Sequence, residues 1–443
     1  MMEFERLPIE EIRGTFACEC GQEHVVTTQE VLIGNALVGK MATLLGGLGT
    51  YRRIGMVYDD NTWAAAGERV YEALKGDYEI VKIRLGGHGA LHADEGALGA
   101  IMMGVYPKCD LILAVGSGTI NDLCRYSAYL MQLPYVLIGT APSMDGLCSS
   151  VSPLTQRGMK ITFEAISPTA VYLDLDVLCK APAAMIAAGL GDMMGKYTAL
   201  RDWELAQVIT GEYRCEALCR MMDNAAQRCL ASAPKLSDRD EGAIKELTQG
   251  LVLSGLAMQM MGNSRPASGS EHHLSHFWEM RAQMLGEQST LHGDKVGVAE
   301  LLMMDFYGRF YQKLPVPTVM DGQMVVDALK RSLGPVAQEV LAQSAVTQDL
   351  GSANAQREKV MQNIALLRQR AQELAQLSPK VKKVIKDAGG PTHPKEMGLS
   401  EQDVMDAILC AMHLRTRFTL LRMAYEWGAV KDIADEMIEE WYA

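Results

Sequence analysis

Short apolar runs alternate with helical patterns through the first third of this chain, and no other sequence feature restricts the fold as strongly. The apolar runs span Arg53–Tyr58, Tyr78–Leu85, Asp110–Val115 and Tyr135–Gly139. Strands separated by helices are joined in parallel, because each helix carries the chain back to the edge where the previous strand began. We therefore predict an α/β domain on a parallel sheet, with ligands bound beyond the carboxyl ends of the strands.

The chain before this alternation is expected to form a β-hairpin from Thr15–Cys20 and His24–Thr27, followed by a helix over Thr28–Leu45. The hairpin contains side chains of the types that bind metals. They are Cys18, Cys20 and His24. A hairpin that turns at Gly21 and carries small apolar side chains is nevertheless the favoured interpretation of this stretch.

From Pro182 onward the pattern changes, because strand-like runs almost vanish and apolar residues recur at the helical period. We predict an α/β domain over residues 1–180 and an all-α domain over residues 181–443. Within the first domain, a helix over Thr62–Leu74 is expected to begin at Asn61 as its N-cap.

Charge and composition argue against several classes of protein, among them nucleic-acid-binding and membrane proteins. The chain has 443 residues and a formal net charge of 42 − 54 = −12, which argues against nucleic acid or an anionic membrane as the main partner. No run of apolar residues is long enough to span a membrane, and the acidic N-terminus differs from a signal peptide. Ten scattered cysteines are then expected to be reduced thiols in a cytoplasmic protein.

Two predicted strands end in loops of small and polar residues. Gly116–Thr119 opens a helix, where backbone N–H groups can approach a phosphate, although such a turn can also serve only as a connection. Asp59, at the end of an earlier strand, suits ribose hydroxyls or, alternatively, a helix cap. The loop Thr140–Gly146 places Asp145 at the same sheet edge, where it suits a polyol substrate.

Histidines concentrate in a second region. Ser270 is a suitable N-cap for a helix on which His272 and His276 share one face, and His292 begins the next helix. They suit a divalent metal. The alternative is that they meet surface carboxylates such as Glu271 and Asp294.

Asp192 is the one acid in a strongly apolar helix. Such an acid is costly to bury unless it is paired or binds a cation. Asp192 either pairs with Lys196, one turn away, or binds a metal ion together with His272 and His292. One carboxylate and two imidazoles with an open fourth position are typical of a catalytic metal.

The order of these motifs resembles the sn-glycerol-1-phosphate dehydrogenase family, in the superfamily of iron-type alcohol dehydrogenase, glycerol dehydrogenase and dehydroquinate synthase. The resemblance runs from about Asp59 to Met304. Its motifs are Gly116-Ser-Gly-Thr119, Thr140-Ala-Pro-Ser-Met-Asp-Gly146, Gly191-Asp-x-x-x-Lys196, Ser268-Gly-Ser-Glu-His-x-x-x-His276 and His292-Gly-x-Lys-Val-Gly297. It implies a dehydroquinate synthase-like fold, with a Rossmann-like NAD(P)-binding domain and a helical metal- and substrate-binding domain.

The resemblance also implies site residues. The metal ligands would be Asp192, His272 and His292, and Asp192 would also meet the substrate. The NAD or NADP site would comprise Asp59, Gly116, Ser117, Gly118, Thr119, Ile120, Asn121, Thr140, Ser143 and Ser149. The catalytic and substrate-facing residues would be Asp145, His276 and Lys196. Because Lys196 stands where iron-type relatives have a histidine ligand, zinc is favoured, with nickel as the alternative.

The implied reaction is the reversible, NAD(P)H-dependent reduction of dihydroxyacetone phosphate to sn-glycerol 1-phosphate. Arg265 is a candidate donor to the substrate phosphate, or else a surface loop cation. A homo-oligomer is expected, with a small phosphorylated substrate as the partner. The alternatives are a polyol dehydrogenase, a dehydroquinate-synthase-like enzyme, and a non-catalytic metal- or nucleotide-binding protein.

Overall fold

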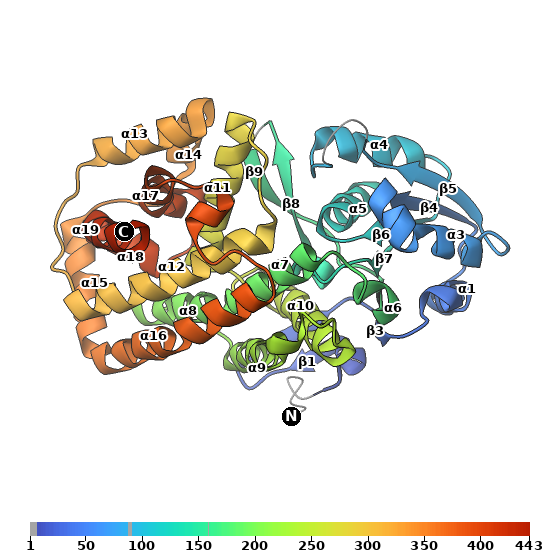
Figure 1. Ribbon diagram of the computed structural model, residues 1–443, viewed down its shortest axis with the longest axis horizontal. Helices are drawn as coiled ribbons and strands as arrows, with labels where there is room; N and C mark the ends of the chain where they lie inside the picture. Colours follow the sequence, from blue (N-terminus) through green and yellow to red (C-terminus); the bar gives the residue numbers. More distant parts are fainter. Residues whose placement is uncertain (1–6, 87–90, 158) are drawn as a thin grey trace. The chain divides into compact units, whose positions relative to one another are not determined.

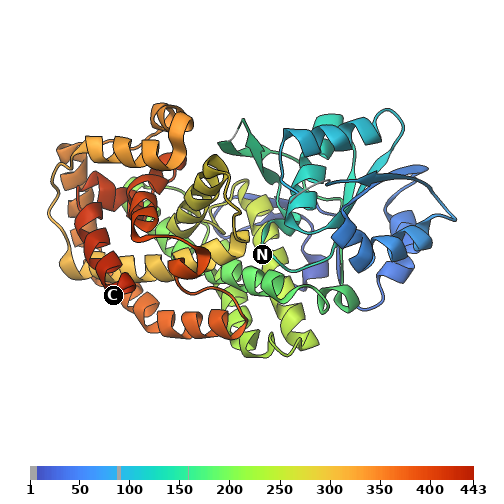
Figure 2. The same cartoon turned by 45° about the horizontal axis from the view of Figure 1, so that its top comes forward.

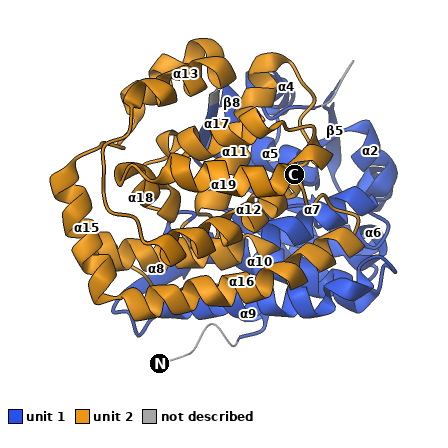
Figure 3. Cartoon of the chain, turned by 60° about the vertical axis from the view of Figure 1, so that its left-hand side comes forward, with its two compact units in different colours: residues 1–193, 216–264 blue, residues 194–215, 265–443 orange. Residues whose placement is uncertain are grey.

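The computed structural model describes residues 7–86, 91–157 and 159–443. The chain divides into two compact units, which Figure 3 shows in different colours. Unit 1 comprises Met1–Met193 and Glu216–Ser264, and unit 2 comprises Met194–Cys215 and Arg265–Ala443. Unit 1 thus takes in helices α9 (Glu216–Ser232) and α10 (Glu241–Met261) from beyond the sheet region. The division into functional domains at residue 180 stays a prediction.

A six-stranded parallel sheet forms the centre of unit 1 (Figure 1). Its order is β3-β10-β7-β6-β4-β5. The strands are β3 (Glu30–Gly34), β4 (Arg53–Tyr58), β5 (Glu79–Arg84), β6 (Leu111–Gly116), β7 (Tyr135–Gly139) and β10 (Ala170–Asp174). The central strands β6, β7 and β10 are buried along their whole length, as expected when helices cover both faces of a parallel sheet. The predicted α/β architecture is confirmed.

Two smaller antiparallel hairpins accompany the sheet in unit 1. Strands β1 (Gly14–Ala17) and β2 (Glu23–Val26) pair with each other, which confirms the hairpin that was predicted around Gly21. Strands β8 (Val151–Gln156) and β9 (Met159–Glu164) form the second hairpin, which is drawn as two adjacent arrows in Figures 1 and 2.

The predicted helix over Thr28–Leu45 is wrong. Residues Glu30–Gly34 form strand β3, which pairs in parallel with β10, and helix α1 (Met41–Leu48) begins only after a short 3₁₀ turn. The apolar residues of this stretch fit both periods, and pairing with the sheet favours the extended form.

The predicted cap at Asn61 is also wrong. The helix begins two residues earlier, and Asp59 is its N-cap: the Thr62 N–H donates to Asp59 Oδ1 at 2.7 Å, and the Asp59 N–H donates to Thr62 Oγ1 at 3.0 Å. Helix α2 (Asp60–Thr62) continues through a π-helical turn into α3 (Glu68–Leu74). This carboxylate is well placed to accept from the first turn.

The remaining helices of unit 1 are α4 (Glu95–Val105), α5 (Gly118–Met131), α6 (Leu175–Leu178) and α7 (Ala183–Met194). Helix α7 ends at the boundary with unit 2. Helix α5 begins directly after β6, as the Gly116–Thr119 motif predicts.

The regular secondary structure of unit 2, all of which lies in the described part of the chain, is helical. Its α-helices are α8 (Lys196–Thr210), α11 (Ser270–Leu285), α12 (His292–Lys313), α13 (Gly322–Leu333), α14 (Ala337–Gln343), α15 (Leu350–Gln362), α16 (Ile364–Asp387), α17 (Glu401–Cys410), α18 (Leu420–Glu426) and α19 (Val430–Tyr442). Helices α12 and α16 pack along each other, and α11 packs on α12. Among the described residues, no helix is long and apolar enough to cross a membrane.

Candidate active site

In unit 1, the two predicted loops meet at the carboxyl ends of β6 and β7. The Ser117 hydroxyl lies 2.5 Å from that of Ser143 and donates to the Ala141 carbonyl at 3.1 Å. The Asn121 amide donates to the Gly146 carbonyl at 3.2 Å. The Thr140 N–H bonds the Gly116 carbonyl at 3.0 Å. The structure therefore brings these predicted cofactor-binding residues together.

The other predicted cofactor-binding residues lie at the same sheet edge or close to it in the chain. Ile120 is on the first turn of α5 and is buried. Ser149 bonds within its own loop, where its hydroxyl accepts the Val151 N–H at 3.0 Å. The Asp59 side chain caps α2, so the helix-cap alternative describes one of its contacts.

A buried arginine that the sequence analysis did not identify fixes the loop after β7. Arg125, on α5, is fully buried and bonds Asp122 Oδ1 at 2.6 Å and the Tyr135 hydroxyl at 3.0 Å. Its guanidinium also donates to the carbonyls of Gly146 and of Val151. A guanidinium in a buried polar network of this kind holds the backbone of the loop in one conformation.

Asp145 and Asp192, two predicted site residues, lie next to each other within unit 1. The Asp145 N–H donates to Asp192 Oδ2 at 2.9 Å, and the Ser254 hydroxyl donates to Asp145 Oδ2 at 2.7 Å. Asp192 is fully buried. Gly189 permits this arrangement, because a Cβ there would lie only 1.9 Å from the Pro142 carbonyl oxygen.

In unit 2, three imidazoles form a triangle. The ring centroids of His272 and His292 are 5.4 Å apart, those of His276 and His292 are 5.5 Å apart, and those of His272 and His276 are 6.2 Å apart. Helix α11 supplies two of these rings from one face, as the four-residue spacing predicts, and the first residue of α12 supplies the third.

A carboxylate fixes the orientation of His272. Glu271 Oε1 lies 2.7 Å from His272 Nδ1, the contact by which a carboxylate orients a metal-binding histidine. Glu271 is fully buried, which excludes the alternative that it is a surface carboxylate. Burial opposes its ionisation, but bonds from His272, the Gly269 N–H and the Thr198 hydroxyl hold the pKa of Glu271 below its usual value.

The predicted N-cap at Ser270 is wrong by one residue. Gly269 occupies the cap position, and Ser270 is the first helical residue. The Ser270 N–H donates at 2.7 Å to Asp202 Oδ2, on α8, which takes the place of a local cap. A Cβ at Gly269 would lie 2.7 Å from the same carboxylate oxygen, so glycine is required here.

Further buried acids lie behind Glu271. The Thr198 hydroxyl lies within hydrogen-bond distance of Glu271 and of Glu300. Burial and the charge of Glu271 raise the pKa of Glu300 well above its usual value, and they raise the pKa of Asp202 to about 6. A chain of hydrogen bonds therefore runs from Glu300 through Thr198 to Glu271 and His272.

In the structure, each of the two predicted cations of unit 2 has its own hydrogen-bond partner. The Lys196 ammonium, fully buried, donates to the Ala267 carbonyl at 2.9 Å. Arg265 is 2% exposed and forms a bidentate pair with Glu212, at 2.5 Å from each oxygen. A further bond, to the Phe418 carbonyl at 2.9 Å, joins Arg265 to the C-terminal segment. Arg265 is therefore not a surface loop cation.

Two arginines from that C-terminal segment, which the sequence analysis did not select, complete a cationic cluster. Burial and the charges of Arg265 and Arg415 lower the pKa of Arg417 to about 9. Burial also lowers the pKa of Arg415. Burial and the charges of Arg417 and Arg415 lower the pKa of His273 so far that the ring is neutral. Mutual repulsion among buried cations is relieved by an anion, so the cluster suits one.

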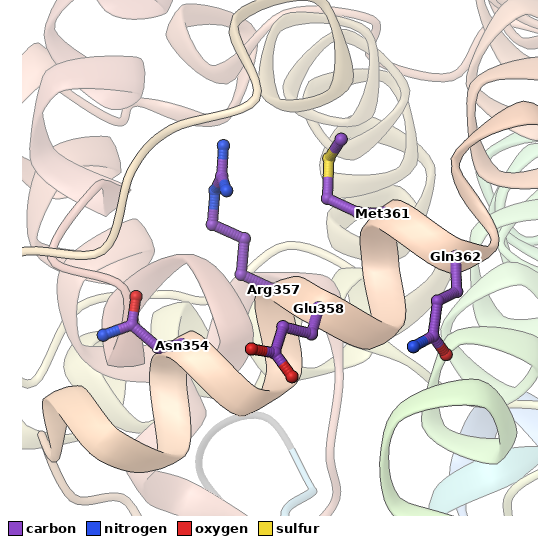
Figure 4. Close-up of a pocket in the computed structure, with 5 residues that line it drawn as sticks. All are labelled: Asn354, Arg357, Glu358, Met361 and Gln362. Atoms are coloured by element: carbon purple, nitrogen blue, oxygen red, sulfur yellow. The ribbon is translucent and has the colours of Figure 1, made fainter.

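Unit 2 also has a pocket on the side of α15, with a volume of about 430 Å³ (Figure 4). It is lined by Asn354, Arg357, Glu358, Met361 and Gln362. Arg357 and Met361 point to the same side of the helix. None of the predicted site residues lines this pocket, so we do not assign the site to it.

The fold is similar to that of solved dehydrogenase structures, and part of the chain matches a known family model. The family model described as iron-containing alcohol dehydrogenase matches residues 32–182. Solved structures agree with the fold. A probable glycerol dehydrogenase from Sinorhizobium meliloti has a TM-score of 0.60 and 15% identity, over 92% of this chain and 97% of that one. An archaeal alcohol dehydrogenase from a Red Sea brine pool has a TM-score of 0.61 and 13% identity, over 94% and 98%.

More particularly, the chain belongs to the glycerol-1-phosphate dehydrogenase family. It is 36% identical to the glycerol-1-phosphate dehydrogenase [NAD(P)+] of Bacillus licheniformis, over 72% of this chain and 84% of that protein. It is 32% identical to the enzyme of the same name from Geobacillus stearothermophilus, over 91% of this chain and 94% of that protein. The family that the motif order resembles is thereby confirmed.

Proposed function

We propose that the protein catalyses the reversible, NAD(P)H-dependent and metal-dependent reduction of dihydroxyacetone phosphate to sn-glycerol 1-phosphate. The observation that carries the proposal is the His272–His276–His292 triangle, in which Glu271 orients the His272 ring. Neutral imidazoles with oriented rings fit a divalent metal. Kinship with glycerol-1-phosphate dehydrogenases over most of the chain supports the choice of substrate.

The proposed metal ligands are Asp192, His272 and His292, with zinc favoured and nickel as the alternative. When bound, such an ion supplies a Lewis acid that polarises the substrate carbonyl. In unit 2 taken alone, donor atoms of His276, Glu279 and His292 also lie within 4.8 Å of one another. That set is a rival for the position of the ion, and Asp192→Asn distinguishes the two because only the proposed set needs Asp192.

We assign the NAD(P) phosphates to the N-terminus of α5. The N–H groups of the first turn and the hydroxyls of Ser117 and Ser143 offer donors there. Arg125 donates to the Gly146 carbonyl and so holds in place the loop that carries Ser143. Asp59 is proposed to meet the ribose hydroxyls with the part of its carboxylate that the helix cap leaves available.

The substrate phosphate is assigned to the cationic cluster of unit 2. Arg265 is already paired with Glu212, so we propose that it orients the segment around Phe418, while Arg415 and Arg417 carry the charge that meets the phosphate. Asp145 and His276 are proposed to hold the substrate hydroxyls, with His276 also moving the proton. Lys196, bonded to the Ala267 carbonyl, is proposed to position the loop before α11.

The experiment is NADH and NADPH oxidation by zinc-loaded protein, with dihydroxyacetone phosphate and, in parallel, unphosphorylated dihydroxyacetone. We expect turnover of the phosphorylated ketone and its loss after treatment with a chelator. Turnover of dihydroxyacetone and glycerol alone would instead establish the polyol dehydrogenase alternative. Chelator-resistant turnover would contradict the metal site.

A further inference from the structure

We propose a second metal site, for a structural zinc ion, at the β1–β2 hairpin of unit 1. Its ligands are Cys18, Cys20 and His24. The donor atoms of these residues all lie within 4.8 Å of one another. Thiolate and imidazole are the donors of structural zinc sites. The site is independent of the proposed reaction, for which none of these residues is required.

The turn of the hairpin creates this arrangement. The Cys18 N–H donates to the Gln22 carbonyl at 3.1 Å, and the Gly21 N–H donates to the Cys18 carbonyl at 3.1 Å. Gly21 has a φ of +84°, a value that favours glycine, so the chain reverses immediately after Cys20. The reversal returns β2 alongside β1 and brings His24 next to the two thiols.

The distance between the donors fits a tetrahedral ion. Cys20 Sγ lies 3.5 Å from His24 Nε2. With zinc–sulfur and zinc–nitrogen bonds of about 2.3 and 2.0–2.1 Å, the tetrahedral edge between such atoms is about 3.6 Å. A thiol–imidazole hydrogen bond alone gives a similar separation, and the experiment below distinguishes the two.

The hydrogen bond behind the His24 ring supports the zinc site independently of the spacing of the donor atoms. The ring is 2% exposed, and its Nδ1 lies 2.9 Å from the Met260 carbonyl, on α10 of the same unit. A carbonyl only accepts, so Nδ1 carries the proton and Nε2 presents its lone pair toward Cys20. Metal-binding histidines are oriented in this way by a carbonyl or carboxylate behind the ring.

A structural role follows from the position of the hairpin. Strands β1 and β2 form a sheet of their own, and an isolated two-stranded hairpin is only marginally stable. A zinc ion would cross-link the turn to His24, which is bonded to α10.

The experiment is a metal count and a cobalt spectrum on the full-length protein. Wild type, Cys18→Ser, Cys20→Ser and the control Cys179→Ser, at a partly exposed thiol of the same unit, are each loaded with Zn²⁺ and desalted. We expect the wild type and the control to retain one zinc per chain more than the site variants. His292→Ala should lose the proposed catalytic ion and keep this one, so the two proposals fail separately.

Cobalt in place of zinc should give thiolate charge-transfer bands in the near ultraviolet in wild type and Cys179→Ser, and these bands should fall in Cys18→Ser and Cys20→Ser. Circular dichroism checks that the variants are folded. Equal zinc content and identical cobalt spectra in wild type and Cys20→Ser would overturn the proposal. A Cys18–Cys20 disulfide in freshly purified protein, detected by mass spectrometry, would also overturn it.

Discussion

The Glu271 carboxylate lies 2.7 Å from Nδ1 of His272, the residue that follows it on helix α11. Behind this pair, Thr198 connects Glu271 to Glu300, whose pKa is raised well above its usual value by burial and by the charge of Glu271. The pKa values of the two acids are therefore shifted in opposite directions: Glu271, which bonds the histidine, has the lowered pKa, and Glu300, behind it, has the raised one. This asymmetry gives two otherwise similar residues different expected responses to the same substitution.

Glu271→Gln should weaken metal binding by about 10- to 100-fold, because the amide no longer provides a charged acceptor for the imidazole N–H. Glu300→Gln is the matched control and should change the affinity little, since the raised pKa of Glu300 favours the uncharged acid that the amide imitates. The affinity is measured by competition with a chromophoric chelator. Equal losses in the two variants would show that Glu271 has no special role in orienting His272.

Arg415→Met and Arg417→Met should raise the KM for dihydroxyacetone phosphate by about 10- to 100-fold, the equivalent of about 1.5–3 kcal/mol for a charged hydrogen bond. The activity with unphosphorylated dihydroxyacetone, if measurable, should not fall in parallel. Arg357→Met, in the α15 pocket of the same unit, is the matched control. An unchanged KM in both cluster variants would move the phosphate site elsewhere.

Gly189→Ala should lower the free energy of unfolding by about 1–3 kcal/mol, as overpacking usually does. The added Cβ would meet the Pro142 carbonyl oxygen and push α7 away from the loop that carries Asp145. Gly47→Ala, at an exposed position of α1 with nothing within 4 Å of the new Cβ, should instead leave stability unchanged or raise it by up to about 1 kcal/mol. Urea unfolding of both variants measures the difference, and equal stabilities would contradict the close approach.

His413 should make stability fall in acid. Burial and the charge of Arg422 lower the pKa of this ring from 6.5 to about 4, and the residue is only 6% exposed. Below pH 6.5 the His413 ring is protonated in the unfolded chain, whereas in the folded chain it is protonated only below about pH 4. The contribution of the neutral ring to the free energy of unfolding is therefore fully present above pH 6.5 and is lost as the pH falls from 6.5 to about 4. The loss is about 3 kcal/mol at most. His413→Asn should flatten this part of the stability curve, and an unchanged slope would exclude His413 as its source.

The local patterns of the sequence predicted much of the fold. Alternating strands and helices gave the parallel sheet, and the four-residue spacing of His272 and His276 placed both rings on one helix face. The helix predicted over Thr28–Leu45 was wrong because β3 is stabilised by pairing with β10, which is distant in sequence. The periodicity of apolar residues within a short segment cannot predict a pairing with a strand so far away in the sequence.

The supporting residues of the site depend on contacts of the same distant kind. Glu271 resembled a surface acid in the first turn of a helix, and only Thr198 and Glu300, from two other helices, show that it is buried. Arg417 lies far along the chain from Ser268, to whose carbonyl it bonds at 3.1 Å. The sequence does show two arginines on either side of Thr416, but no local pattern indicates that they belong to the same site as the histidines.

The most direct test of the proposed function is the oxidation of the two glycerol phosphate enantiomers, measured separately with zinc-loaded protein and NAD⁺ or NADP⁺. We predict that sn-glycerol 1-phosphate is oxidised, that sn-glycerol 3-phosphate is not, and that His292→Ala abolishes the activity. Oxidation of the 3-phosphate, or full activity in His292→Ala, would contradict the proposal.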